Sequence, residues 1–364
     1  MLSDLSAGGA ERSTLQLVGD LARRGFAPTL FLLRRRGEFL GQVPPDIRLA
    51  WALEGDARVH RNAPTIAWKL LRCARECDVI VGALEHESTY FAYLCARMLK
   101  RPAIGWVHAV MGEHLKELSP VHSRLARLLY PRMDRLVFPS QGAAASLAGV
   151  VRLPPERSSV IPSYVDVASL EMQARDPVPP WAIAVFAKPT VINVGRLVPA
   201  KGLDTLLRAH ARVRNDGIDH HLLIVGEGPL REELACLADA LGVGSSVFLP
   251  GFTPNPYSLM RAAAVFALSS RFEGLSVVLL EALGLGVPIV ATDCPGGPAE
   301  VLDGGNFGLL VPPGDVAALA GGISRLLRDR TLTETLRAHG PVRARQFGRE
   351  SVLQRWEKVL AEAG

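Results

Sequence analysis

The sequence predicts an α/β protein made of two Rossmann-like, doubly wound domains. Short apolar runs alternate with amphipathic stretches along almost the whole chain, which is typical of parallel sheets covered by helices. At 364 residues, the chain is long enough for two domains rather than one. Residues 162–190 contain five prolines and no sustained periodicity, so we predict a linker there.

The domain boundaries follow from that linker. We expect a first Rossmann-like domain over residues 1–165 and a second one over 166–347. A last helix over 348–364 is expected to pack back toward the first domain. Ligands of doubly wound sheets bind at the carboxyl ends of the strands, so two such domains would bind a ligand in a central cleft that both face.

In the first domain, short buried strands are separated by helical stretches. Residues 1–12 are expected to form a loop that leads into the first helix, with no strand ahead of it. Because a Rossmann-type domain normally begins with a strand, we expect the first strand to be missing and the true start to lie upstream. The expected strands are 28–33, 78–82, 103–108, 135–139 and 158–161, and the expected helices are 10–24, 65–76, 88–100, 117–130 and 140–148.

The second domain repeats this alternation with longer and more regular apolar runs. Its expected strands are 190–195, 221–226, 246–251, 264–269, 288–292 and 308–312. Its expected helices are 202–215, 229–241, 255–263, 276–285, 315–328 and 331–346.

Composition excludes several classes of protein. Apolar residues make up 48% of the chain and charged residues 21%, which favours a large core over disorder. The net charge of +5 favours anionic partners such as phosphates or an acidic membrane surface. No basic stripe with interleaved aromatic residues occurs, so a nucleic-acid partner is not expected. The five cysteines form no CxxC pair, which favours reduced thiols in a cytoplasmic protein and no metal site.

Two glutamates are the most informative residues. Glu281 is the only charge between Gly274 and Thr292, in a helix whose apolar residues predict burial on every side. A buried carboxylate requires hydrogen-bond partners. Glu273 lies where the strand 264–269 turns into that helix. Two acceptor groups there suit a ligand rich in hydroxyls, such as a ribose and a sugar; the alternative is a solvated Glu273 and a Glu281 paired with a buried arginine.

Two cations follow the first strand of the second domain. Arg196 comes directly after the strand 190–195, and Lys201 lies five residues later, before a helix. Strand-to-helix turns are where α/β folds bind phosphate, and two cations there would neutralise a diphosphate without a metal. The alternative is an exposed loop with ordinary surface charges.

Glycine-rich turns mark two further candidate sites. Gly226 and Glu227 begin a GEGP turn that resembles half of a GxGxxG fingerprint, with the third glycine absent. Such a turn would let a base or ribose approach the backbone. Gly9, in the GGAER segment 8–12, precedes a helix whose first amides would face an anion. A simple flexible loop explains that segment equally well.

Histidines follow two strands of the first domain. His108 ends the expected strand 103–108, and Glu85, His86 and Glu87 follow the strand 78–82. A single histidine is more often structural than catalytic, but a position at a strand end favours contact with a ligand.

Together these segments resemble the retaining glycosyltransferases of family 4, which have the GT-B fold. The resemblance rests on GGAER at 8–12, Arg196 with Lys201, GEGP at 226–229, and the segment 269–302. In it, the spacing of Glu273 and Glu281 matches the E-x7-E motif of that family. The similarity covers most of the chain and is densest in the second domain.

The resemblance implies a role for each candidate residue. Arg196 and Lys201 would hold the donor diphosphate, with Gly9 beneath the phosphates. Glu273 would bind hydroxyls of the donor sugar, helped by the amides of Gly274 and Leu275. The remaining candidates are Glu281 at the ribose, His108 near the donor sugar, and Gly226 with Glu227 at the nucleotide. Such enzymes retain the anomeric configuration and are expected to need no metal or cofactor.

The implied function is transfer of a sugar from a nucleotide-sugar donor to a saccharide or lipid-linked saccharide. Bacterial-type synthesis of a cell-surface polysaccharide or glycoconjugate would be its setting. The donor base and sugar are not determined by these motifs. The alternatives are a sugar-nucleotide epimerase or phosphorylase of the same fold, and a catalytically silent homologue that serves as a scaffold.

The acceptor side gives one further signal. The helix 117–130 and its extension carry Arg124, Arg127, Arg132 and Arg135 beside Leu125, Leu128, Leu129 and Met133. A basic amphipathic face binds to an anionic bilayer, which would place a polyprenyl-linked acceptor at the cytoplasmic face of the inner membrane. The alternative is a solvated face whose arginine stems cover the core.

Overall fold

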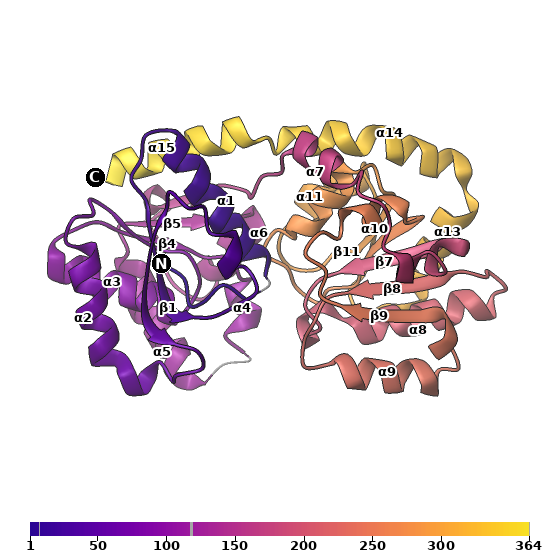
Figure 1. Cartoon of the computed structure of the whole chain (residues 1–364), viewed down its shortest axis with the longest axis horizontal. Helices are drawn as coiled ribbons and strands as arrows, with labels where there is room; N and C mark the ends of the chain where they lie inside the picture. Colours follow the sequence, from indigo (N-terminus) through magenta and orange to yellow (C-terminus); the bar gives the residue numbers. More distant parts are fainter. Residues whose placement is uncertain (7, 117–118, 364) are drawn as a thin grey trace. The chain divides into compact units, whose positions relative to one another are not determined.

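The computed structural model describes residues 1–6, 8–116 and 119–363 (Figure 1). It divides into two compact units, one of residues 1–163 with 350–364 and the other of residues 164–349. The C-terminal helix α15 (Arg349–Ala363) therefore belongs almost entirely to the first unit. Both units contain parallel sheets covered by helices, which confirms the predicted α/β class.

The first unit contains two parallel sheets. One pairs β1 (Thr29–Arg35) with β2 (Arg48–Glu54). The other has the order β3-β4-β5-β6. Its strands are β3 (Ile80–Gly82), β4 (Ala103–Trp106), β5 (Arg135–Phe138) and β6 (Ser158–Val160).

Residues 1–3 connect these two sheets, although among the described residues no strand precedes α1, as the sequence led us to expect. The Leu2 amide donates to Phe31 O at 3.0 Å, and the Leu33 amide donates to Leu2 O at 3.0 Å. On the other side, the Ala83 amide donates to Met1 O at 2.9 Å. The segment thus occupies the position between β1 and β3. It is too short to show the period-two pattern of a strand, but Leu2 and Leu5 are fully buried.

The helices of the first unit differ from expectation mainly after β4. The expected helix 117–130 is replaced by α4 (Met111–His114) and α5 (Pro120–Leu129), with residues 117 and 118 outside the described ranges. Pro120 explains where α5 begins, because a proline fits the first turn of a helix but not its interior. The other helices are α1 (Gly9–Arg23), α2 (Ala63–Ala74), α3 (Glu87–Leu99) and α6 (Gln141–Ala148).

The second unit has a six-stranded parallel sheet of order β12-β11-β10-β7-β8-β9. The order runs outward in both directions from β7 and β10, so the topological switch point lies between these two strands. Its strands are β7 (Thr190–Val194), β8 (His221–Val225), β9 (Val247–Gly251), β10 (Val265–Leu268), β11 (Ile289–Thr292) and β12 (Leu309–Val311).

Alternate residues of these strands face two separate cores. Ile192 contributes to one core and Val191 to the other. This alternation is expected of a sheet covered on both faces. The helices of the second unit are α7 (Val167–Gln173), α8 (Leu203–Asn215), α9 (Arg231–Ala240), α10 (Tyr257–Ala262), α11 (Val277–Gly284), α12 (Pro298–Val301), α13 (Val316–Arg328) and α14 (Arg330–Gln346).

The predicted linker over residues 162–190 is wrong for most of that range. Helix α7 lies within it, and its buried Val167 and Leu170 belong to a core of the second unit. Asp166 caps this helix by accepting a hydrogen bond from the Ser169 amide at 3.1 Å. The prolines mark turns and short 3-10 helices of a folded segment rather than a free chain.

A buried histidine pair in the second unit predicts acid sensitivity. His210 Nδ1 lies 2.8 Å from His220 Nε2, and His210 Nε2 lies 2.9 Å from Ser246 Oγ. Burial, followed by the neighbouring His220, lowers the pKa of His210 from 6.5 to about 3. The pKa of His210 is lower in the folded than in the unfolded protein. The stability that neutral His210 contributes is therefore fully present above pH 6.5 and is lost as the pH falls toward 3.

We therefore expect the free energy of unfolding to fall by about 1.4 kcal/mol per pH unit for this one group. Chemical unfolding of wild type and His210→Gln between about pH 4 and pH 8 measures the slope. The variant should be less stable at neutral pH but show a shallower acid slope. His339→Gln, at an exposed position of α14, is the control. Parallel slopes for wild type and His210→Gln would contradict this prediction.

Candidate functional site

Two loops meet at the switch point of the second unit. One follows β7 and contains residues 195–202, and the other follows β10 and contains residues 269–273. The Arg271 amide donates to Ala200 O at 2.8 Å, and Ser269 Oγ donates to Lys201 O at 2.9 Å. Gly202 has a φ of +57°, and a Cβ there would lie 2.2 Å from Ser269 O. Only glycine allows so close a backbone approach.

This contact brings Lys201 and Glu273 together. Lys201 Nζ donates to Glu273 Oε1 at 2.6 Å, and Ser270 Oγ donates to the same oxygen at 2.6 Å. The two charged side chains are 21% and 9% exposed. Glu273 Oε2 has no hydrogen-bond partner within the described ranges, and the ammonium has two further N–H groups. The pair thus keeps one acceptor atom and two donors for a ligand.

The two arginines of these loops differ in their partners. Arg271 donates to both carboxylate oxygens of Asp204 at 2.9 Å, so its charge is neutralised within the protein. Arg196 is exposed at the end of β7, and no described residue forms an ion pair with it. The structure therefore leaves the predicted cation Arg196 available to an anion.

Glu281 is buried on α11, as the apolar sequence around it predicts. Its side chain is 6% exposed, and Tyr257 Oη donates to Glu281 Oε1 at 2.9 Å. Tyr257 begins α10, a helix that packs against α11. The hydrogen bond meets part of the requirement that a buried carboxylate has for polar partners.

The turn before α11 is strained. Ser276 has a φ of +69° although it is not glycine, and its buried Oγ has no hydrogen-bond partner in the part of the chain described. Such a conformation costs about 1–3 kcal/mol and is found most often at functional sites. The Leu275 side chain is buried in the core, so only its backbone is left to face a ligand. Gly274 and Leu275 thus lie directly ahead of the helix N-terminus, where the helix dipole favours anions.

The GEGP turn has a structural role that the sequence did not reveal. A Cβ at Gly226 would lie 1.9 Å from Gly195 O, and one at Gly228 would lie 2.4 Å from Leu197 O. These glycines allow the turn after β8 to pack against the backbone of the loop after β7. The Glu227 side chain is about half exposed and pairs with Arg231 at 3.2 Å.

Gly9 and His108 belong to the first unit. Gly9 is the first residue of α1, next to Gly8 at the N-cap. Strand β4 ends at Trp106, two residues before His108. Burial lowers the pKa of His108 to about 3, and its Nε2 atom has no hydrogen-bond partner among the residues that the structure describes. His108 is thus held as a neutral imidazole.

A second histidine group follows β3. His86 has a φ of +60°, and its ring stacks on His114 at a centroid distance of 4.9 Å and meets His122 edge-on at 5.2 Å. Burial and these two neighbours lower the pKa of His86 to about 3. Glu85 Oε1 accepts from the Ala109 amide at 2.5 Å, which connects this loop to the segment that follows β4. Within the described ranges, no group of three or more His, Cys, Asp or Glu side chains is arranged to hold a metal ion.

The predicted basic amphipathic face is only partly exposed. Leu129 and Met133 belong to the core, and Arg135 donates to Glu362 Oε2 at 2.8 Å. Arg124 and Arg127 remain exposed. No helix in the described part of the chain is both long and apolar enough to span a bilayer.

Sequence reasoning missed three residues of this region. Ser270 shares the Lys201–Glu273 hydrogen bonds, and its place three residues before Glu273 was an available signal. Tyr257 lies 24 residues from Glu281, and only the packing of α10 on α11 reveals it. The strain at Ser276 had no sequence signal, because serine is common at helix N-termini with ordinary backbone angles.

Two family descriptions match the chain. Residues 7–169 match "Glycosyltransferase Family 4", and residues 185–343 match "Glycosyl transferases group 1". A protein of Campylobacter jejuni subsp. jejuni is 31% identical over 242 residues and is named N-acetylgalactosamine-N,N'-diacetylbacillosaminyl-diphospho-undecaprenol 4-alpha-N-acetylgalactosaminyltransferase. That match covers 66% of this chain and 64% of that protein, which is less than two thirds of its length.

A second relative and a solved structure extend the similarity. The GDP-mannose-dependent alpha-(1-6)-phosphatidylinositol monomannoside mannosyltransferase of Mycolicibacterium smegmatis is 40% identical over 151 residues, 39% of either chain. The crystal structure of HepE from Anabaena in complex with UDP-glucose superposes with a TM-score of 0.85 and 22% identity. It covers 99% of this chain and 98% of that one. At that identity the superposition establishes the fold.

Proposed function

This chain belongs to glycosyltransferase family 4 and has the GT-B fold, and on that basis we propose that it transfers a sugar from a nucleotide-sugar donor to a saccharide or lipid-linked saccharide. The observation that carries the proposal is the Lys201–Glu273 pair at the switch point of the second unit. It places an ammonium and a carboxylate side by side, each with capacity left for a ligand. A nucleotide sugar carries the matching groups, a diphosphate next to sugar hydroxyls.

The proposed chemistry assigns separate tasks to these groups. Lys201 and Arg196 bind the diphosphate, and Glu273 Oε2 accepts a hydrogen bond from a sugar hydroxyl. The bond between the anomeric carbon and the phosphate oxygen breaks, and the acceptor oxygen bonds that carbon. The acceptor proton passes to the departing diphosphate. Cations held in place before the reaction stabilise the negative charge that develops on the phosphates.

The remaining candidates complete the proposal. Glu281, oriented by Tyr257, binds the ribose hydroxyls, and the backbone at Gly274 and Leu275 contacts the donor sugar. Gly226 and Glu227 lie at the nucleotide, while Gly9 and His108 of the first unit contribute to donor binding. We propose retention of configuration, with no metal and no cofactor.

For the acceptor, we propose a polyprenyl- or lipid-linked saccharide in the synthesis of a cell-surface polysaccharide or glycoconjugate. Support comes from two relatives whose names include a diphospho-undecaprenol and a phosphatidylinositol monomannoside. An acceptor of this kind places the protein at the cytoplasmic face of the inner membrane, in peripheral contact with anionic lipid.

Ligand-induced stabilisation tests the donor. Thermal unfolding of wild type and Lys201→Met is measured with UDP-, GDP- and ADP-sugars. One of these nucleotides should stabilise wild type, by about 2.7 kcal/mol at a hundredfold excess over Kd. The variant should lose most of that shift. If no nucleotide sugar stabilises wild type, the scaffold alternative is favoured; nucleotide release that needs no acceptor favours an epimerase.

A further inference from the structure

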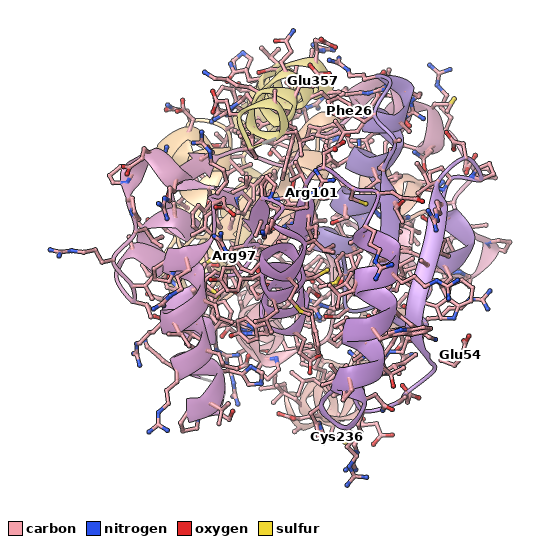
Figure 2. All side chains as sticks on the ribbon, turned by 90° about the vertical axis from the view of Figure 1, so that its left-hand side faces the viewer. Phe26, Glu54, Arg97, Arg101, Cys236 and Glu357 are labelled. Carbon is pink, nitrogen blue, oxygen red and sulfur yellow. The ribbon has the colours of Figure 1, made fainter. Side chains whose placement is uncertain are left out.

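Three helices of the first unit lie side by side and expose apolar side chains to solvent. Helix α3 contacts both α2 and α5, and Figure 2, in which Arg97 is labelled on α3 and Arg101 just beyond its C-terminal end, looks onto this surface. We name it the three-helix face. Ten large apolar residues are exposed in the described chain, and half of them lie on this face. These five are 50% to 67% exposed: Trp68, Leu94, Met98, Val121 and Leu128.

The helical positions of these residues put them on outward sides. Leu94 and Met98 are four residues apart on α3, so they lie one above the other. Val121 and Leu128 are seven residues apart on α5, which also places them on one side of that helix. Exposed apolar side chains that gather in this way are typical of an interaction surface.

The same face is strongly basic. Helices α2 and α5 contain no acidic residue, and the only one of α3 is Glu87 at its first position. Two exposed cations have acidic neighbours, Arg97 at 3.1 Å from Asp134 and Arg101 at 3.8 Å from Asp78. The exposed Glu76, at the end of α2, pairs with Arg48 at 3.3 Å. Seven other exposed cations of these helices and their ends form no ion pair with a described residue: Arg61, Arg72, Arg75, Lys100, Arg124, Arg127 and Arg132.

The combination of apolar and unpaired basic side chains identifies the partner. A second copy of this face would carry the same sign of charge and would be repelled. Single-stranded nucleic acid requires a row of aromatic rings, but Trp68 is the only strongly exposed aromatic residue of the three helices. The Arg72 guanidinium carbon lies over the Trp68 ring, 5.8 Å from the ring centroid. A tryptophan beside a cation suits the boundary between lipid headgroups and acyl chains.

We propose that the three-helix face docks the first unit onto an anionic bilayer. The arginines contact lipid phosphates while Trp68, Leu94, Met98, Val121 and Leu128 enter the headgroup region. The surface differs from the basic face predicted from sequence, because it spans three helices and excludes the buried Leu129 and Met133. The proposal rests on the proposed function only in supplying a reason for membrane contact, since a lipid-linked acceptor lies there.

Vesicle cosedimentation of the full chain tests this proposal. The probes are phosphatidylcholine vesicles with and without roughly one third phosphatidylglycerol. Wild type should bind only the anionic vesicles, and high salt should weaken the binding. The triple variant Arg72→Gln, Arg124→Gln, Arg127→Gln should bind about 100-fold more weakly, at about fivefold for each cation lost.

A second variant tests the apolar contribution. Trp68→Ser, Leu94→Ser, Met98→Ser alters only exposed side chains, so it should fold normally and yet lose the binding that remains at high salt. The matched control is Arg208→Gln, Arg212→Gln, Arg325→Gln, which removes three exposed arginines from α8 and α13 of the second unit. It should bind vesicles like wild type.

Three results would overturn the proposal. In the first, wild type binds neutral vesicles as well as anionic ones. In the second, the control variant weakens vesicle binding as much as the triple variant does. In the third, the triple variant loses binding to an RNA oligonucleotide but keeps its binding to anionic vesicles. Lys201→Met separates this proposal from the enzymatic one. It should transfer sugar about 10²–10³-fold more slowly but bind anionic vesicles normally, so failure of either proposal leaves the other standing.

Discussion

Replacing Lys201 by methionine is expected to lower the rate of sugar transfer by about 10²–10³-fold without unfolding the protein. The ammonium is one of two cations at the switch point that are available to the departing diphosphate, and its hydrogen bond also orients Glu273. Methionine keeps a side chain of similar length but supplies no charge. The measurement is kcat with a saturating donor, together with thermal unfolding to verify the fold.

The matched control for this variant is Lys188→Met. Lys188 forms an ion pair of similar length, 2.7 Å to Asp219, and its side chain is 42% exposed. Its loss should leave kcat unchanged because it lies before β7 rather than at the carboxyl edge of the sheet. Glu273→Ala should lose activity as Lys201→Met does. Full activity in both Lys201→Met and Glu273→Ala would remove the proposed transfer mechanism.

Replacing Gly226 by alanine is expected to destabilise the second unit by about 2–4 kcal/mol. Two effects add at this position. The φ of +145° is one that residues with a side chain rarely adopt, and the new Cβ would lie 1.9 Å from Gly195 O. Because the contact is with backbone, no side chain can rotate away to relieve it. Denaturant unfolding measures the loss.

Gly217→Ala separates the two effects. Gly217 also has a positive φ, +84°, but nothing lies within 4 Å of a Cβ there. It should therefore show only the backbone cost, about 1 kcal/mol. If both variants lose the same stability, the close approach of the loops after β7 and β8 contributes nothing. Donor binding should fall in Gly226→Ala alone, since displacement of the loop moves Arg196.

Local patterns allowed most elements to be predicted. The six strands of the second unit were found because each is a short apolar run, and all but β10 are bounded by glycine or proline. Strand β2 was missed although residues 49–53 form a continuous apolar run, so a local signal was available. Helix α7 was missed because nearby prolines hid a short apolar helix that is stabilised by packing.

The sequence by itself determined the α/β class, the two-domain division and the types of residue available to the site. The positions of the cations after β7 and of the carboxylates around α11 could be predicted locally, because each is set by the end of a strand or by the periodicity of a helix. Only the tertiary structure decided which of them meet. Lys201 and Glu273 are 72 residues apart in the chain, and they share a hydrogen bond because β7 and β10 are neighbours in the sheet. Likewise, the basic character of the region around α5 was predicted from the sequence, but the three-helix face exists only because α3 contacts both α2 and α5. Strand order and helix packing depend on contacts between distant residues, and these contacts leave no periodic signal in the sequence.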